Sequence, residues 1–412
     1  MHTTVRGFRD ILPPFSELIT EIEMASRNIF DLYNCKEIRI PTVEYYQLFL
    51  KSTGETTDIV EKEMYKFTDS SKRELAIRPE GTPGVARAYI NNNLNLSGKN
   101  TKFFYIGNMF RAERPQAGRF REFEQIGLEY INTNSPYSDA EAILVLNHIL
   151  KKLDINSFSI EINSIGCQEC RYKYREKLLN YLNSKKDLLC NSCKTRMDRN
   201  PLRTLDCKID KEILNDIPKI DLCDNCLSHH NVLKNILSKA NVNFKENKML
   251  VRGLDYYSRT VFEFKTDLLG SQDAIAAGGR YDNLIKNMGG MNAPAVGWAM
   301  GVDRVAMLIE KKEGLKEKKP LVFLVCMNKE IAEYCFMEAQ ALRDEGISCD
   351  FSDFTSSIRS QMRAADNSQA KFAIIIGDDE FKNNFFSLKD LKEKKQIQFK
   401  KEELLKYLKE NI

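Results

Sequence analysis

The sequence predicts an α+β fold divided into several domains, and three patterns in its 412 residues indicate this organisation. Two apolar runs with strand-like alternation, at 102–110 and 120–131, flank a polar segment and predict an antiparallel β-hairpin with a long tip. Residues 167–244 change to Lys-, Asn- and Cys-rich helical segments, which indicates an insertion. After residue 320, strands alternate with helices, as in a small α/β domain with a parallel sheet.

Length and composition exclude several classes of protein. A chain of this length makes about two to four domains, each with its own core, so a small disulfide scaffold is excluded. The net charge is only +4 at pH 7, so bulk charge does not indicate a nucleic-acid partner. The sequence has neither a secretion signal nor a long apolar run, so we expect a cytoplasmic protein without a membrane span. Its eleven cysteines are then expected to be reduced thiols or metal ligands.

The N-terminal region alternates helices with short strands. Apolar residues at helical spacing predict an amphipathic helix at 15–33, and 38–49 is predicted to be a strand entering a polar loop. Residues 75–90, LAIRPEGTPGVARAYI, predict a short strand, a Pro/Gly loop and a helix. Glu80 and Thr82 are therefore expected at the turn before that helix.

The second strand of the predicted hairpin has two chemically different faces. Because side chains alternate along a strand, one face is expected to carry Arg121, Phe123, Gln125, Gly127 and Glu129. The other face carries Ile126, Leu128 and Tyr130. The apolar face belongs to the core, and the first face forms a polar floor.

The hairpin segment FRAERPQAGRFREFEQIG (110–127) is suited to bind an anion. Arg111 and Arg119 flank the polar floor, and Gly107 and Gly127 are expected to leave room on it. Guanidinium groups match phosphate oxygens in forked geometry and stay charged at physiological pH. The alternative is a solvated hairpin with exposed Arg–Glu ion pairs, which are common and nearly neutral in energy.

A later segment, GWAMGVDRVAMLIE at 297–310, supports the anion site. It runs from an apolar strand through Gly301 into a helix whose first turn carries Asp303 and Arg304. The positive charge of Arg304 at the N-terminal end of this helix is unfavourable with the helix dipole. An anion bound between the helix N-terminus and Arg304 would explain why a cation is placed there.

Two further segments add polar and aromatic side chains. Strand signals return at 249–257 and 259–267, with a tight Gly-containing loop before the second strand, and AAGGRYDN at 276–283 predicts a Gly-Gly turn. The residues of interest in these segments are Arg252, Tyr256, Tyr257, Arg280 and Tyr281. The alternative for each tyrosine is ordinary half-buried packing.

The C-terminal part follows a charged, Pro-terminated run at 310–320, which we interpret as a linker. Residues 320–412 contain 14 Lys and Arg against 16 Asp and Glu, so their charge does not support RNA binding.

Seven of the eleven cysteines fall inside the insertion, as CQEC (167–170), CNSC (190–193), Cys207 and CDNC (223–226). The spacing of the first two pairs fits a four-cysteine structural Zn²⁺ site. Its ligands would be Cys167, Cys170, Cys190 and Cys193. The CDNC pair could replace either of these two pairs as ligands. Seven thiols do not divide evenly into sites of four ligands, and the alternative to a zinc site is that the cysteines are free thiols. Such a Zn²⁺ would act in folding rather than catalysis.

Taken together and in order, these segments resemble the histidyl-tRNA synthetases, a family of class II aminoacyl-tRNA synthetases. RGFRDILP (6–13) with the helix after it resembles the family's dimer-forming region, 110–129 its motif 2, and GWAMGVDR its motif 3. VRGLDYYSRTVFEF and GGRYD resemble segments specific to the histidine enzymes. The resemblance covers essentially the whole chain.

The resemblance implies a class II synthetase-type antiparallel sheet with flanking helices, a helical insertion domain and a C-terminal α/β anticodon-binding domain. It also implies a homodimer that uses ATP with Mg²⁺ to form histidyl-adenylate and transfers L-histidine to the 3' end of tRNA(His). The expected domains are 1–166 (catalytic, first part), 167–244 (insertion), 245–312 (catalytic, second part) and 320–412 (anticodon-binding).

The resemblance also assigns roles to individual residues. Arg111 would contact the ATP α-phosphate, Phe123 would stack on adenine, and the remaining ATP-binding residues would be Glu113, Arg119 and Arg304. Histidine would be bound by Glu80, Thr82, Arg111, Gln125, Glu129, Arg252, Tyr256, Tyr257 and Tyr281. The catalytic residues would be Arg252, Arg111 and Gln125, and the residues that touch the tRNA acceptor end would be Arg114 and Gln116.

Three alternatives remain at this point. A catalytically silent paralogue, the regulatory subunit of ATP phosphoribosyltransferase, typically lacks the RGLDYY segment and the C-terminal domain, and both patterns are present here. A zinc-dependent nucleic-acid-binding protein would leave the arginine hairpin unexplained. Another class II synthetase would need a different pocket, because Glu129, Tyr257 and Tyr281 fit an imidazole.

Overall fold

The computed structural model of the chain describes residues 2–54, 57, 59–97, 101–116, 118–207, 209–270 and 273–411. The chain forms two compact units, Met1–Leu315 and Lys316–Ile412. The boundary between them falls in the charged run at 310–320, after helix α9 has ended at Glu313.

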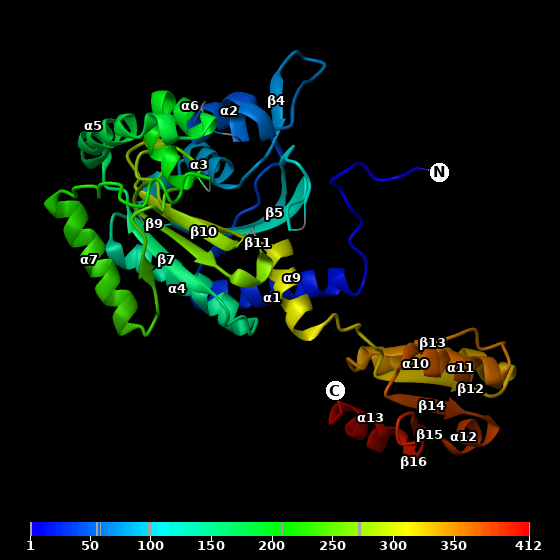
Figure 1. Ribbon diagram of the computed structural model, residues 1–412. Helices are drawn as coiled ribbons and strands as arrows, with labels where there is room; N and C mark the ends of the chain where they lie inside the picture. The colour runs from blue at the N-terminus through cyan, green and yellow to red at the C-terminus, as the bar shows by residue number, and fades with distance from the viewer. Residues whose placement is uncertain are drawn as a thin grey trace. The chain divides into compact units, whose positions relative to one another are not determined.

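An eight-stranded sheet forms the centre of the first unit (Figure 1). Its order is β1 (Lys36–Glu37), β5 (Thr101–Phe110), β6 (Glu122–Ile131), β11 (Ala295–Gly301), β10 (Ala274–Arg280), β9 (Ser258–Lys265), β7 (Ser159–Ser164) and β8 (Lys245–Glu246). The edge strands β1 and β8 pair in parallel with their neighbours, and the other pairs are antiparallel. Strands β5 and β6 are the predicted hairpin, which is confirmed.

Three helices cover one face of this sheet: α1 (Phe15–Leu32), α4 (Pro136–Lys152) and α9 (Val302–Glu313) (Figure 1). Ile126, Leu128 and Tyr130 of β6 are buried in the core that these helices form with the sheet. The alternation predicted for this strand is therefore confirmed, and its polar face is left on the opposite side of the sheet.

The other face carries α2 (Tyr46–Thr53), α3 (Thr82–Asn91) and a small antiparallel sheet of β2 (Val43–Tyr45), β4 (Glu74–Ile77) and β3 (Lys66–Thr68). The strand expected at 38–49 was largely wrong, because only 43–45 belong to a strand and the chain is helical from Tyr46. Phe49, Ser52 and Thr53 are buried on this helix at helical rather than alternating spacing.

Two expectations for the histidine-type segments were also wrong. Residues 249–257 contain no strand and form the loop before β9, where only the tight loop itself was predicted correctly. The glycines of AAGGRYDN are not in a turn: Gly278 and Gly279 lie inside β10, paired on both sides. A Cβ on Gly278 would lie 2.2 Å from the Gly297 carbonyl oxygen, so close strand packing rather than turning requires glycine there.

The insertion is helical, as predicted, with α5 (Gln168–Ser184), α6 (Asn191–Arg199) and α7 (Asp224–Lys239). Helices α5 and α6 share a hydrophobic core with the 250–257 loop and with α3. Helix α7 packs instead against α4, and its Leu233 and Leu237 join the core under the main sheet.

The second unit has a five-stranded sheet of order β13 (Cys349–Phe351), β12 (Val322–Cys326), β14 (Phe372–Ile376), β15 (Phe385–Asp390) and β16 (Gln396–Lys400). Its helices are α10 (Ala332–Asp344), α11 (Ile358–Ser368), α12 (Asp378–Asn383) and α13 (Lys401–Lys409). The three strands predicted from the sequence, β12, β13 and β14, are parallel, as expected, and β15 and β16 extend the sheet in antiparallel orientation. The connection at 391–395 is too short for a crossover and forces a hairpin.

In the part of the chain that the structure describes, no helix combines the length and the apolar character that a membrane crossing requires.

Candidate active site

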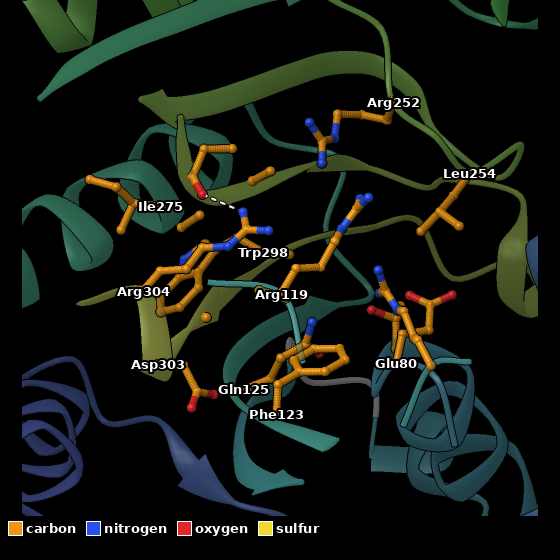
Figure 2. A pocket seen from close by; sticks show the side chains of 18 of the residues that line it. Glu80, Arg119, Phe123, Gln125, Arg252, Leu254, Ile275, Trp298, Asp303 and Arg304 are labelled. Atoms are coloured by element: carbon orange, nitrogen blue, oxygen red, sulfur yellow. Dashed lines mark hydrogen bonds between the residues drawn. The ribbon is translucent and has the colours of Figure 1, made fainter. Parts of the chain in front are cut away.

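A cavity lies over the polar face of the main sheet and gathers most of the predicted site residues (Figure 2). Those lining it are Glu80, Thr82, Arg111, Glu113, Arg119, Phe123, Gln125, Arg252, Tyr256, Tyr257, Tyr281 and Arg304. They come from the start of α3, the β5–β6 hairpin, the loop before β9, the end of β10 and the start of α9. Glu129 lies in the floor beneath them, bonded to Thr82 and Tyr281.

Three guanidinium groups gather at one end of the cavity. Burial lowers the pKa of Arg304, and the nearby positive charges of Arg119 and Arg111 lower it further. Glu113 offsets part of this charge, since it forms an ion pair with Arg119 and lies 3.8 Å from the Arg111 Nη1 atom. The remaining excess of fixed positive charge suits a polyanion such as a triphosphate.

The arginines are held in place by backbone carbonyls. Arg304 donates from Nη1 to the Ala274 carbonyl oxygen at 2.6 Å and from Nε to that of Gly118 at 3.2 Å. Arg111 donates from Nε to the Pro79 carbonyl oxygen at 2.9 Å, and its guanidinium carbon lies 5.3 Å from the centre of the Phe123 ring. These contacts fix the guanidiniums before any ligand arrives.

A buried carboxylate, Glu129, lies in the floor near the tyrosines and is only 1% exposed. Thr82 Oγ1 donates to its Oε1 atom at 2.6 Å, and the Tyr281 hydroxyl donates to Oε2. Burial raises the pKa of Glu129 to about 8. Gly297 of β11 makes room for this group, because a Cβ there would lie 1.9 Å from Glu129 Oε2.

A second buried carboxylate, Glu80, accepts from the Tyr256 hydroxyl at 2.9 Å and from Thr53 Oγ1 at 3.3 Å. Burial raises its pKa as well. A bound cation would restore the charged form of such a group, as an ammonium group does.

Three tyrosine rings stand between the two carboxylates. The ring centres of Tyr256 and Tyr257 are 4.6 Å apart, and those of Tyr256 and Tyr281 are 5.7 Å apart. Burial raises the pKa of Tyr257 to about 12, so its hydroxyl stays neutral and able to donate. This end of the cavity can therefore pair both nitrogens of a flat heterocycle.

Gln125 and Arg252 also line the cavity. Arg252 donates from Nη1 to Glu263 Oε1 at 2.8 Å. Among the described residues, neither Gln125 Oε1 nor Arg252 Nε has a hydrogen-bond partner, although both atoms are buried. A buried polar atom without a partner costs about 1–3 kcal/mol, so both atoms are expected to meet a ligand.

Two predicted residues lie outside this cavity. Arg114 and Gln116 are exposed at the tip of the hairpin, where Gln116 and Arg119 exchange backbone hydrogen bonds of 3.1 and 2.9 Å. This position is compatible with the predicted contact to a large ligand that approaches from solvent.

One expectation about the floor was wrong. Gly107 and Gly127 do not leave room for a ligand, because the space beside them is filled by Arg78 and by the ring of Tyr105. Arg280, singled out in the sequence beside Tyr281, is fully buried and donates to the carboxylate of Asp139.

Other residues of the site were missed by the sequence analysis. Glu263 forms an ion pair with Arg252. Glu263 is the single acidic residue in the segment VFEFK, and this isolated charge was a sequence signal that its side chain lies on the cavity side of β9. Arg9 forms an ion pair with Asp303, 294 positions away in the sequence, and this long-range contact has no local sequence signal. The guanidinium carbon of Arg9 also lies 3.8 Å from the centre of the Phe120 ring.

Because the pKa of Glu129 is raised, the free energy of unfolding is expected to depend on pH. The Glu129 carboxyl group keeps a proton in the folded protein up to about pH 8, whereas the unfolded chain releases it near 4.5. The native state therefore holds more protons in this interval, and the free energy of unfolding should fall as pH rises from about 4.5 to about 8. Denaturant titrations of the wild type and Glu129→Gln across this interval should show a steeper fall in the wild type. Parallel pH profiles would contradict the assignment.

Comparisons with known proteins agree with this architecture. The fold, with its mostly antiparallel sheet, arginine-bearing hairpin and strand-to-helix segment at 295–313, is that of a class II aminoacyl-tRNA synthetase. The family model described as histidyl-tRNA synthetase matches residues 7–305, and the model of an anticodon binding domain matches 321–411. The chain belongs to the histidyl-tRNA synthetase family.

Individual relatives match along the whole chain. The histidine–tRNA ligase of Elusimicrobium minutum is 48% identical over 98% of this chain and 98% of its own length. That of Aquifex aeolicus is 46% identical over 97% of this chain and 99% of its own length. The structure of apo S. aureus histidyl-tRNA synthetase superposes with a TM-score of 0.83 at 30% identity, covering 99% of this chain and all of the other.

Proposed function

We propose that the chain activates L-histidine with ATP to give histidyl-adenylate and transfers the histidyl group to the 3' end of tRNA(His). One observation carries the proposal: a single cavity has converging guanidiniums at one end and buried carboxylates among tyrosines at the other. The first end matches a triphosphate and the second an amino acid with an imidazole side chain. Full-length relatives that are histidine–tRNA ligases support the same activity.

ATP is bound as its Mg²⁺ complex at the arginine end. Arg111 contacts the α-phosphate, Arg119 and Arg304 hold the outer phosphates, and adenine stacks on Phe123, which faces the cavity from β6. Glu113 keeps Arg119 and Arg111 in position and lies close enough to take part in ATP binding. Mg²⁺ would arrive with ATP as part of the substrate and would supply positive charge that offsets the negative charge of the phosphates.

Histidine lies at the carboxylate end. Its α-ammonium group pairs with Glu80 and Thr82, which are buried at the start of α3. Its imidazole is read by Glu129, Tyr257 and Tyr281. Since these groups are buried, an isosteric amino acid without the ring nitrogens would leave them unpaired and would be rejected.

Adenylate formation joins the two ligands between Gln125 and Arg252. An oxygen of the histidine carboxylate attacks the α-phosphorus, the bond to the bridging oxygen breaks, and pyrophosphate leaves. Arg111 and Arg252 stabilise the charge that grows on the α-phosphate oxygens, and Gln125 orients the carboxylate. The attacking carboxylate is already ionised, so no side chain needs to act as a strong base.

The tRNA contacts lie outside the cavity. Arg114 and Gln116 at the exposed hairpin tip touch the acceptor end, and the second unit, which matches an anticodon binding domain, recognises the anticodon. A direct test is charging of tRNA(His) with labelled histidine in the presence and absence of ATP. ATP-dependent charging is expected, and a folded protein that charges no tRNA would refute the proposal.

The assembly is proposed to be a homodimer that works in the cytoplasm. Apolar residues of the N-terminal region, including Val5 at 66%, Leu12 at 68% and Leu32 at 72% exposure, supply a surface that a second copy could cover. The eleven cysteines form no disulfide, which fits a reducing compartment. Sedimentation equilibrium should give the dimer mass.

The competing function is that of a catalytically silent regulatory subunit of ATP phosphoribosyltransferase. The segment with Arg252 and Tyr257 and the anticodon-type unit, both expected to be missing from such a paralogue, are present here. Histidine activation by the isolated protein separates the two functions.

The proposed contacts of Arg119 and Arg304 with the outer phosphates can be tested through the KM for ATP. Arg304→Ala and Arg119→Ala should each raise the KM for ATP by about 10- to 100-fold, because each removes a charge-assisted bond worth about 1.5–3 kcal/mol. Histidine binding in the absence of ATP, measured by calorimetry, should be nearly unchanged. An unchanged KM for ATP would remove these residues from the ATP site.

A structural Zn²⁺ in the insertion is the remaining cofactor proposal, and the placement of the cysteines decides which residues would bind it.

A further inference from the structure

The seven cysteines of the insertion gather in two separate clusters rather than one. The first cluster consists of Cys167, Cys170, Cys223 and Cys226, and the second of Cys190, Cys193, Cys207 and Asp210. Within each cluster, the potential ligand atoms all lie within 4.8 Å of one another. We propose that each cluster binds one Zn²⁺ ion, so that the chain carries two structural metal sites.

This arrangement corrects the ligand set expected from the sequence. CQEC and CNSC do not share a cluster: the first pair joins CDNC and the second joins Cys207. Seven thiols seemed not to divide into four-ligand sites, but the carboxylate of Asp210 supplies the eighth ligand. Zn²⁺ accepts both thiolate and carboxylate ligands in tetrahedral sites.

The sulfur separations fit a tetrahedral metal and not a disulfide. Cys167 Sγ and Cys170 Sγ are 3.6 Å apart, and Cys190 Sγ and Cys207 Sγ are 3.8 Å apart. Zn–S bonds of about 2.3 Å in a tetrahedron place neighbouring sulfurs about 3.8 Å apart. A disulfide would need about 2.05 Å. Four soft thiolates in the first cluster and three in the second favour Zn²⁺ over Mg²⁺ or Ca²⁺, which prefer oxygen ligands.

The backbone around both clusters is shaped to hold thiolates. Each CxxC pair begins a helix, with Cys167 before α5, Cys190 before α6 and Cys223 before α7. Backbone N–H groups point at the sulfurs: that of Cys223 donates to Cys170 Sγ at 3.2 Å, and that of Asp210 to Cys207 Sγ at 3.5 Å. Such outer hydrogen bonds orient metal ligands and favour their charged form.

The two sites would tie the insertion to the loop that carries Arg252 and the tyrosines. Arg171, next to Cys170, donates to the Tyr257 carbonyl oxygen at 2.9 Å. Between Cys193 and Cys207, Asn200 donates to Asp255 Oδ1 at 2.8 Å and Arg203 to the Gly253 carbonyl oxygen at 3.0 Å. The metals therefore fix, through these three residues, the loop at 251–257. This consequence rests on the proposed function, whereas metal binding itself does not.

Metal content of the purified full-length protein tests the two sites without any substrate. Elemental analysis should give two zinc ions per chain for the wild type, one for Cys223→Ser and one for Cys207→Ser. The control Cys349→Ala, in the second unit and outside both clusters, should keep two. A wild type without zinc, or a Cys207→Ser variant that keeps as much zinc as the wild type, would overturn the proposal.

Cobalt substitution keeps the proposal testable if a cysteine variant does not fold. Wild-type protein refolded with Co²⁺ should take up two equivalents and show thiolate-to-cobalt charge transfer with tetrahedral d–d bands. Uptake of one equivalent or none would contradict two sites. The milder Asp210→Asn variant, which retains all seven thiols, should change the d–d bands of one cobalt only, and an unchanged spectrum would remove Asp210 from the ligand set.

Activity measurements separate the positioning role from the binding. Loss of the second metal in Cys207→Ser should raise the KM for histidine at least several-fold and leave the KM for ATP nearly unchanged, because the loop at 251–257 contacts the histidine end. If Cys207→Ser loses one zinc ion but has unchanged kinetics, the second metal site is supported and its proposed effect on the loop at 251–257 is contradicted. If no variant or wild type activated histidine, the metal count would still stand while the proposed function failed.

Discussion

Replacing Arg252 with alanine is expected to reduce adenylate formation by about 100- to 1,000-fold, the usual effect of removing one fixed group that stabilises transition-state charge. The guanidinium lies in the cavity, is oriented by Glu263 and has a buried Nε atom that is unpaired among the described residues. Histidine binding should be partly retained, because Glu80 and Glu129 remain. Single-turnover adenylate formation and calorimetric histidine titration measure the two quantities separately.

The matched control for this variant is Arg175→Ala, which removes an exposed arginine from α5 and should behave as the wild type. Arg252→Lys keeps the charge but loses the forked geometry, so it should fall between the wild type and alanine. Near-wild-type activation by Arg252→Ala, in a variant with native stability, would remove this residue from the mechanism.

Replacing Glu129 with glutamine is expected to raise the KM for histidine by about one to two orders of magnitude. Burial keeps Glu129 protonated in the free protein, but a bound imidazolium would favour its charged form, and a hydrogen bond to a charged group is worth about 1.5–3 kcal/mol. The Glu129 oxygens already accept hydrogen bonds from Thr82 and Tyr281, and they can accept one more hydrogen bond from an N–H group of the imidazole. An amide offers one acceptor oxygen and places N–H groups against these donors. Steady-state exchange kinetics with varied histidine measure the effect, and the KM for ATP should hardly change.

The control for Glu129 is Tyr281→Phe, which keeps the ring and removes only the hydroxyl that donates to the carboxylate. Its effect on the KM for histidine should be smaller than that of Glu129→Gln. An unchanged KM in Glu129→Gln would place the imidazole elsewhere in the cavity.

Local periodicity was enough to predict the parts of the site that lie on regular elements. Alternation along β6 placed Phe123, Gln125 and Glu129 on one face, and the structure has Phe123 and Gln125 in the cavity wall with Glu129 in its floor. The strand-to-helix change at Gly301 likewise placed Arg304 correctly.

The errors arose where long-range packing decides the outcome. The sequence cannot tell whether the space beside Gly127 receives a ligand or the Tyr105 ring from the neighbouring strand. In the same way, the CxxC pairs are equivalent in sequence, and only the packing of α5, α6 and α7 decides which pair joins which. Asp210 had no local signal at all, because an acidic residue in a polar loop is ordinarily solvated.

Pyrophosphate exchange into ATP, measured with each of the twenty amino acids in turn, tests most directly whether this cavity joins a triphosphate to histidine. We predict exchange that depends on histidine and is lost in Arg252→Ala. Absence of exchange with every amino acid, from a folded wild-type protein with its full metal content, would contradict the account and favour the regulatory paralogue.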